Sequence, residues 1–173
     1  MNSPAANENM NIREAIAVLD EHVLDPSSGL PDEVFYYISR HTPLVNVELL
    51  IKDENNRTLL SWRNDRLCGQ GWHIPGGIVR FKETLAKRIE KVAETEIGAP
   101  VTYDPAPVTI EEIILHDREI RGHFISFLYR CHLSGSFVPP NTDLSRYGAG
   151  FLKWHTSCPD DLLVFQDVYR TYI

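Results

Sequence analysis

The stretch Gly76-Gly77-Ile78-Val79-Arg80-Phe81-Lys82-Glu83, with the segment Glu94-Thr95-Glu96-Ile97-Gly98 that follows it, decides the fold of this 173-residue chain. Together they predict a glycine turn, a short strand, a second turn and an amphipathic helix that ends at glycine. One face of this helix carries Leu85, Ile89, Val92 and Glu96. A carboxylate at the rim of an apolar stripe costs roughly several kcal/mol unless it is paired, so Glu96 needs a cation or a hydrogen-bond donor.

The rest of the chain reads as an α/β domain. The expected strands are Val45–Lys52, Arg57–Trp62, Val108–Leu115, Phe124–His132 and Phe151–Trp154. The expected helices are one with apolar residues from Ile12 to Val23, one starting near Pro31, one at about 83–97, and a last one capped by Asp160 or Asp161. At this length the chain favours one domain that buries about two-thirds of its unfolded surface.

The glycine-to-helix stretch resembles the signature of the Nudix hydrolases, Gx5Ex7REUxEExGU, where U is a bulky apolar residue. The matching residues are Gly77, Glu83, Lys91 in the arginine position, Glu96 and Gly98. The chain departs from the signature at Val92 and Thr95, where the family has two more glutamates, and at Ala99. In the family those glutamates bind divalent metal, so their loss weighs against ordinary pyrophosphate cleavage.

One branch, the GDP-mannose mannosyl hydrolases, tolerates a similar loss and breaks the sugar–phosphate bond instead. Its likeness to this chain continues through three segments, 41–51, 58–63 and 72–77. The resemblance implies the Nudix fold, with a mixed β-sheet sandwiched between helices. It places a Nudix domain at 41–173, after a tail and two extra N-terminal helices at 1–40. It also implies Mg²⁺ (or Mn²⁺) as cofactor and a homodimer.

The same resemblance assigns roles to residues around the glycine turn. It implies that Glu96 and the main-chain carbonyl of Gly76 bind the metal; the alternative is that Glu96 forms a salt bridge with a nearby Arg or Lys. It implies that Glu83 is structural and pairs with Lys91, although these residues are eight positions apart, roughly two helical turns. Gly77 and Gly98 complete the structural residues of the motif.

Three further charged residues fall where the branch binds its substrate. Arg63 corresponds to an arginine on the leaving diphosphate, a role that suits the guanidinium fork; the alternative is a surface arginine at a strand end. Glu48 corresponds to an acidic residue that contacts the nucleotide, with an ordinary strand carboxylate as the alternative. The arginine expected directly after the glycine pair is replaced by Ile78, and Arg80, two residues on, is a candidate substitute.

The general base is the gap in this resemblance. The branch carries a glutamine–histidine pair just before its last tryptophan strand, where this chain has 146–151 with neither residue. His116 and His123 lie near positions where the branch has active-site histidines, and either is a candidate base. His73 is equally consistent with a core histidine, and Tyr147 could reach a water only if its loop moved in.

Composition excludes several classes of partner. The net charge of −7 argues against nonspecific binding to nucleic acid or to an anionic membrane. No apolar run approaches a membrane span, and the first residues lack a signal-peptide core. The three scattered cysteines show neither a metal spacing nor a disulfide framework, which favours the cytoplasm.

We therefore expect a cytoplasmic hydrolase that cleaves the glycosyl C–O bond of a nucleoside-diphosphate sugar similar to GDP-mannose, with metal assistance. The alternatives are a pyrophosphohydrolase that acts on nucleoside-diphosphate-linked substrates and a nucleotide-sugar-binding Nudix domain whose catalytic residues have eroded.

Overall fold

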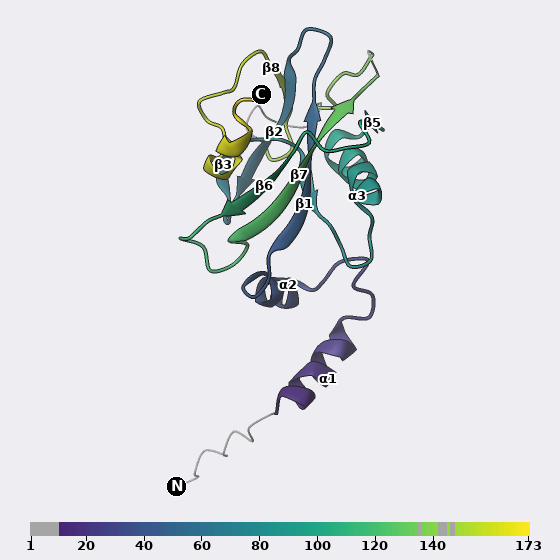
Figure 1. The fold of residues 1–173 in the computed structure, drawn as a ribbon, viewed down its shortest axis with the longest axis vertical. Coiled ribbons are helices and arrows are strands. Elements are labelled where there is room, and N and C mark those ends of the chain that lie inside the picture. The colour runs from purple at the N-terminus through teal and green to yellow at the C-terminus, as the bar shows by residue number, and fades with distance from the viewer. Residues whose placement is uncertain (1–10, 135, 142–144, 146–147) are drawn as a thin grey trace.

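The computed structural model describes residues 11–134, 136–141, 145 and 148–173, which form two β-sheets with helices around them (Figure 1). The larger sheet contains β1 (Leu44–Ile51), β4 (Gly76–Ile78), β5 (Thr102–Tyr103), β6 (Thr109–Ile114) and β7 (His123–His132). Its strand order is β4-β1-β7-β5, with β6 also paired to β7. Because β1 and β7 are parallel and the other pairs antiparallel, the sheet is mixed, and the predicted α/β class is confirmed.

The smaller sheet is antiparallel and contains β3 (Gly69–His73), β2 (Thr58–Asp65) and β8 (Leu152–His155) in that order. Strand β2 runs three residues beyond the predicted end at Trp62, so Arg63 lies within the strand, opposite Gly71 of β3. The two-residue strand β5 was not expected from the sequence. It pairs with the end of β7 through Thr102 and Tyr103.

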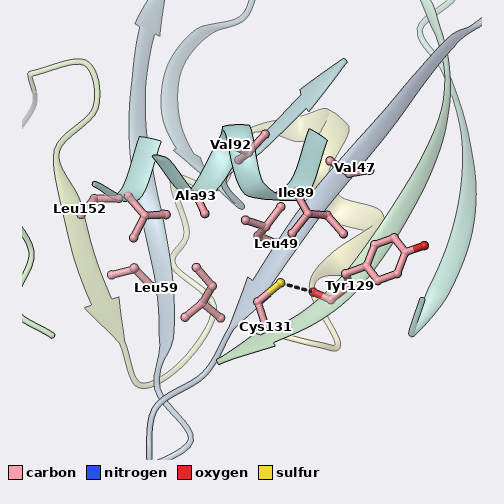
Figure 2. Close-up of a cluster of buried hydrophobic side chains, with 11 residues drawn as sticks. Val47, Leu49, Leu59, Ile89, Val92, Ala93, Tyr129, Cys131 and Leu152 are labelled. Atoms are coloured by element: carbon pink, nitrogen blue, oxygen red, sulfur yellow. Dashed lines mark hydrogen bonds between the residues drawn. The ribbon is translucent and has the colours of Figure 1, made fainter. Parts of the chain in front are cut away.

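Alternation along β1 divides the interior into two cores. Val47, Leu49 and Ile51 face the first core, while Leu50 faces the second. Figure 2 shows the first core, where helix α3 (Leu85–Val92) packs on β1 and β7. The second core lies under the C-terminal 3-10 helix η2 (Val164–Tyr169) and contains the two tryptophans of β2 and β3. The two helices thus cover opposite sides of the central strands (Figure 1).

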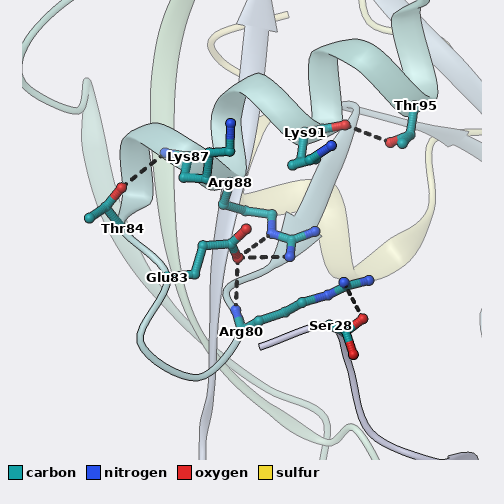
Figure 3. Close-up of polar contacts among 8 residues, drawn as sticks. All are labelled: Ser28, Arg80, Glu83, Thr84, Lys87, Arg88, Lys91 and Thr95. Atoms are coloured by element: carbon teal, nitrogen blue, oxygen red, sulfur yellow. Dashed lines mark hydrogen bonds and ion pairs between the residues drawn. The ribbon is translucent and has the colours of Figure 1, made fainter. Parts of the chain in front are cut away.

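The loop before α3 is held by an ion pair that differs from the predicted one. Glu83 pairs with Arg88, whose Nη2 lies 2.7 Å from the carboxylate, and both side chains are only 11% exposed. The predicted partner, Lys91, instead pairs with Glu94 at 2.8 Å on the solvent side, and Figure 3 shows Arg88, not Lys91, in contact with Glu83. The spacing explains the difference. Residue 88 lies one turn into the helix and can reach back to Glu83, whereas residue 91 lies a further turn away.

The helix at 83–97 has two parts. After Val92 the α-helix continues as a π-helical turn, η1 (Ala93–Ile97), and Gly98 ends it in the left-handed conformation with a φ of 73°. The Gly98 N–H donates to the Ala93 carbonyl, five residues back. A non-glycine residue would be strained at this φ. Such π turns occur often at functional sites, and this one contains Glu96.

The last helix is shorter than expected. It is a 3-10 helix that begins at Val164, with no side-chain cap, rather than an α-helix capped by Asp160 or Asp161. The chain at Leu162 and Leu163 is instead held in extended form against Trp72, whose carbonyl accepts the Leu163 N–H. That contact delays the helix and places Gln166 inside the fold, only 1% exposed.

The two N-terminal helices are α1 (Ile12–His22) and α2 (Asp32–Ser39). Helix α1 opens with a capping box between Asn11 and Glu14, and none of its residues is buried. It projects away from the sheets (Figure 1). Within the ranges that the structure describes, no helix is long and apolar enough to cross a membrane.

Because Glu83 pairs with Arg88 and not with Lys91, replacing Arg88 should destabilise the protein more than replacing Lys91. Arg88→Gln leaves the Glu83 carboxylate largely buried without its cation, which should lower the free energy of unfolding by about 3 kcal/mol. Lys91→Gln, the matched control on the solvent face, should change it by less than about 0.5 kcal/mol. Denaturant unfolding of both variants measures the difference, and equal effects would contradict the assignment.

Candidate active site

Two carboxylates from different parts of the chain meet beside the glycine turn. Glu48 lies on β1 and is only 4% exposed, and Glu96 lies half-buried on the π turn η1. The pairing of β1 with β4 sets Glu48 directly opposite Gly76, whose N–H donates to the Glu96 carboxylate. A Cβ at position 76 would overlap the Glu48 carboxylate, so glycine is required there for a close approach.

One oxygen of the Glu48 carboxylate accepts hydrogen bonds, and the other has no donor among the described residues. Its Oε1 accepts from the Asn46 amide at 2.7 Å and from the Gln166 amide at 3.2 Å. Gln166 is fixed in turn, because its Oε1 accepts the Ile74 N–H at 3.0 Å. The Glu48 Oε2 is buried and has no hydrogen-bond partner among the described residues. A buried carboxylate oxygen without a donor calls for a cation.

Burial raises the pKa of both carboxyls. Burial, followed by the nearby charge of Glu96, raises the pKa of Glu48 to about 8. Burial raises the pKa of Glu96 to about 7, against the opposing charge of Arg63. The two groups therefore share about one proton at neutral pH. A divalent cation between them would remove this repulsion.

Arg63 and His73 stand at the boundary of two hollows. The arginine hollow, of about 210 Å³, is lined by Glu48, Arg63, His73, Gly76, Arg118 and Arg121, among others. The loop hollow, of about 490 Å³, is lined by Arg63, His73, Glu96, Asn141 and Gly150, among others. Because Arg63 and His73 line both hollows, they form the wall that the two share. A long ligand could cross this wall next to the carboxylate pair.

The Arg63 side chain is held by an ion pair but stays partly exposed to solvent. Its Nε lies 2.9 Å from the Asp65 carboxylate, and its side chain is 28% exposed. Asp65 is itself held by the backbone N–H groups of Leu67 and Cys68. The guanidinium is thus positioned by one carboxylate while its charge still acts on Glu48 and Glu96. This arrangement suits contact with a phosphate.

His73 belongs to the core and to the site at once. It is 7% exposed, and its Nδ1 lies 2.8 Å from the Ile74 carbonyl, so Nδ1 carries the proton. Burial, reinforced by Arg63, lowers the pKa of His73 to about 4. The ring is therefore neutral at physiological pH, and its Nε2 can accept a hydrogen bond. The sequence left open whether His73 was simply a core residue.

The carboxylate pair fits a divalent cation with few protein ligands. Glu48, Glu96 and the Gly76 carbonyl would hold it, and magnesium commonly binds to one or two carboxylates together with water and substrate phosphates. In the described part of the chain, no group of three or more His, Cys, Asp or Glu residues could hold a metal. Val92 lies in the first core, and the Thr95 hydroxyl donates to the Lys91 carbonyl at 2.8 Å (Figure 3), so neither replaces the glutamates of the signature.

Other predicted site residues lie apart from the carboxylate pair. His116 is exposed, and His123 pairs with Glu112 at 3.1 Å; both line a separate hollow beside the loop after α2. Arg80 donates to the Ser28 carbonyl near the N-terminal helices (Figure 3) and lines neither the arginine hollow nor the loop hollow. Tyr147 lies outside the described residues.

Four residues of the site were missed by sequence reasoning. Asn46 and Gln166 hold Glu48, and Arg118 and Arg121 line the arginine hollow. Asn46 could have been found, because it lies two residues before Glu48 on the same face of a strand. The two arginines lie in the loop that the sequence singled out for its histidines. Nothing in the sequence marks Gln166, because its role depends on how the C-terminal segment packs.

The raised carboxyl pKa values predict stability that falls with pH in metal-free protein. Between pH 7 and 8 the folded state holds a proton that the unfolded chain, with its glutamates near 4.5, has lost. The free energy of unfolding should therefore fall by about 1 kcal/mol per pH unit. His73 and His155, with pKa values of about 4, act only at lower pH and with the opposite sign.

Urea unfolding in EDTA at pH 7 and 8 measures this slope. Glu48→Gln removes the buried charge and should flatten it, whereas Glu90→Gln, on the exposed face of α3, should leave it unchanged. A wild-type slope of zero would show that the pair is already compensated without metal.

Comparisons with known proteins identify the fold. No protein-family model matches the chain. Over 86 residues it is 35% identical to the low-salt glycan biosynthesis protein Agl8 of Haloferax volcanii; the match covers 50% of this chain and 54% of that protein, so the chain spans about half the length of this curated relative.

Solved structures match more of the chain at lower identity. A MutT Nudix hydrolase from Burkholderia pseudomallei aligns with a TM-score of 0.58 and 20% identity, over 77% of this chain and 99% of that one. A possible asymmetric diadenosine tetraphosphate hydrolase from Jonesia denitrificans aligns with a TM-score of 0.58 and 19% identity, over 76% and 92%. The MutT protein from Methanosarcina mazei gives 0.56 and 21%, over 76% and 94%. The chain therefore has the Nudix hydrolase fold.

Proposed function

We propose that this protein is a hydrolase that cleaves a nucleoside-diphosphate sugar similar to GDP-mannose at the glycosyl C–O bond, with Mg²⁺ or Mn²⁺ as cofactor. The observation that carries the proposal is the carboxylate pair Glu48–Glu96, with one buried oxygen unpartnered, next to Arg63 between two hollows. When bound, the cation would neutralise charge on the diphosphate leaving group.

The chain's own residues have separate roles in binding the cation and the diphosphate. Glu48 and Glu96 bind the cation, and Asn46 and Gln166 fix the orientation of Glu48. Arg63 binds the diphosphate and stabilises the charge that grows on it as the bond breaks. Its Asp65 contact keeps the guanidinium directed along the wall between the hollows. The role first assigned to Glu48, contact with the nucleotide, thus becomes metal binding in this proposal.

The two candidate general bases lie outside the hollow that contains Glu96. His116, in the loop between β6 and β7, and His123, at the start of β7, stay candidates, but each lines a different hollow from Glu96 and would act only after a movement toward it. Arg80 likewise stays a candidate substrate contact that requires movement away from Ser28. His73 is closer to the pair but is a weak base, because its pKa is about 4.

Two observations favour a sugar nucleotide over other substrates. The segments that resemble the mannosyl hydrolases include Glu48, Arg63 and the glycine turn, which the structure brings together. The curated relative is a glycan biosynthesis protein, and glycan synthesis consumes activated sugars. A cytoplasmic location is part of the proposal, and it rests on the scattered spacing of the three cysteines in the sequence.

A nucleotide-sugar-binding domain without turnover is the second candidate. It is favoured by the positions of Val92 and Thr95, which leave two carboxylates where the family signature has more. A pyrophosphohydrolase would need the same missing carboxylates and is therefore less favoured.

Product analysis with GDP-mannose and Mg²⁺ tests the reaction. We expect free mannose and GDP, and Glu96→Gln should lower kcat by about a hundredfold or more because metal assistance is lost. Glu94→Gln, on the exposed side of the same turn and paired with Lys91, is the matched control and should keep full activity.

The other products decide between the alternatives. GMP and mannose phosphate would contradict C–O cleavage and show pyrophosphohydrolase chemistry. Tight binding of GDP-mannose by calorimetry without any product would favour the binding domain. A Glu96→Gln variant as active as the wild type would refute the metal assignment.

We also propose that the protein is a homodimer in which α1 packs against a second copy. An isolated helix of 11 residues is marginal in water, yet α1 buries no residue in its own chain and leaves Ile12 79% exposed. Its residues Ile16 and Leu19 instead line an apolar groove of about 930 Å³ between α1, α2 and the start of β1. A second copy of the same helix would cover this apolar surface.

Light scattering after gel filtration tests the dimer. The wild type should have the mass of two chains, and Ile16→Asp should shift it to one, because a charge would enter the apolar contact. Ala17→Asp adds the same charge on the opposite face of α1 and should leave the dimer intact. A monomeric wild type would contradict the proposal.

A further inference from the structure

The arginine hollow contains more positive charge than the proposed role of Arg63 requires. Arg118 and Arg121, from the loop between β6 and β7, line it together with Arg63. Asp65 pairs with Arg63, but in the described ranges no carboxylate lies within 4.0 Å of the guanidinium of Arg118 or Arg121. Three guanidiniums around one hollow are unexpected in a chain with a net charge of −7, unless they meet an anion.

Aromatic rings, rather than carboxylates, hold the two loop arginines. The Arg118 guanidinium carbon lies 5.4 Å from the centre of the Phe165 ring, and that of Arg121 lies 6.0 Å from the centre of the Phe35 ring. Cation–π contacts of this kind orient a guanidinium without neutralising it. Both arginines thus keep N–H donors for another partner. The Arg121 Nε is buried and has no hydrogen-bond partner among the described residues.

The loop that presents these arginines is tightly built. It is closed by a 2.7 Å hydrogen bond from the Leu115 N–H to the Gly122 carbonyl. Arg121 adopts a left-handed backbone with a φ of 53°, and its N–H donates to the Ser39 hydroxyl at 3.2 Å. A non-glycine residue is strained in this conformation, and strain of this kind is concentrated at ligand sites. Burial and the charges of Arg63 and Arg118 also lower the pKa of Arg121.

We infer that Arg118 and Arg121 form, with Arg63, a binding site for a phosphate group of the substrate. This inference rests on the proposed function and adds to it the residues that bind the diphosphate on the side away from the loop hollow. A guanidinium fork matches two phosphate oxygens, and desolvated forks bind more strongly than exposed ones. The hollow, at about 210 Å³, has room for a phosphate or diphosphate group next to the carboxylate pair.

Inorganic pyrophosphate binding by the full-length chain in EDTA tests the site without metal or turnover. Calorimetry should show binding to the wild type, weakened by about tenfold or more in Arg118→Gln and in Arg121→Gln. Arg13→Gln removes an equal charge from the exposed helix α1 and should bind as the wild type does. Thermal unfolding accompanies each variant; if Arg121→Gln fails to fold, Arg118→Gln decides.

Competition establishes whether the phosphate belongs to the substrate. GDP should displace pyrophosphate from the wild type, and failure to compete would refute the link to the substrate. Pyrophosphate affinity unchanged in both arginine variants, or no binding at about 10 mM pyrophosphate, would overturn the site itself. Arginine-dependent binding without turnover of any sugar nucleotide would instead refute only the proposed reaction, so the two failures can be distinguished.

Discussion

The close approach of Gly76 to Glu48 determines the geometry of the whole site. The pairing of β4 with β1 sets these residues opposite each other, and only a glycine leaves space for the Glu48 carboxylate. The same glycine donates its N–H to Glu96. Two carboxylates are therefore held together by the backbone, although both burial and repulsion disfavour their charged forms. The unfavourable arrangement persists because strand β1 fixes Glu48 and the π turn η1 fixes Glu96.

Structural and functional demands compete along the helix that carries Glu96. Val92 is 2% exposed in the first core, and burying such a side chain stabilises the fold by about 2 kcal/mol. A glutamate could not take its place without loss of that packing. The Thr95 hydroxyl bonds to its own helix. The two carboxylates that could hold a cation are thus Glu96 of the π turn and Glu48 of strand β1. This placement differs from that of the glutamates in the family signature.

The sequence predicted the local features of this fold better than the long-range ones. The glycine turn, the helix and Glu96 follow from spacing within about twenty residues, and five of the strands lie within three residues of their expected ends. The partner of Glu83 was predicted from the signature as Lys91, but the bend of the loop favours Arg88. Gln166 reaches Glu48 across 118 positions, and no periodicity in the sequence reports such a contact.

The loop at 116–121 shows why residue type alone was insufficient to find the site. His116 in this loop and His123 just after it are candidate bases by residue type, yet both line a separate hollow, whereas Arg118 and Arg121 of the loop line the same hollow as Arg63. The arginine hollow thus has positive charge without a carboxylate partner at Arg118 and Arg121, and it is also lined by Glu48, whose Oε2 is unpartnered among the described residues. The positive charge of Arg118 and Arg121 does not pair with the Glu48 carboxylate, because the aromatic rings hold the arginines and the backbone of β1 holds Glu48. In the proposed reaction, a cation bound to a phosphate would satisfy both at once, and a metal-bound nucleoside diphosphate carries that combination.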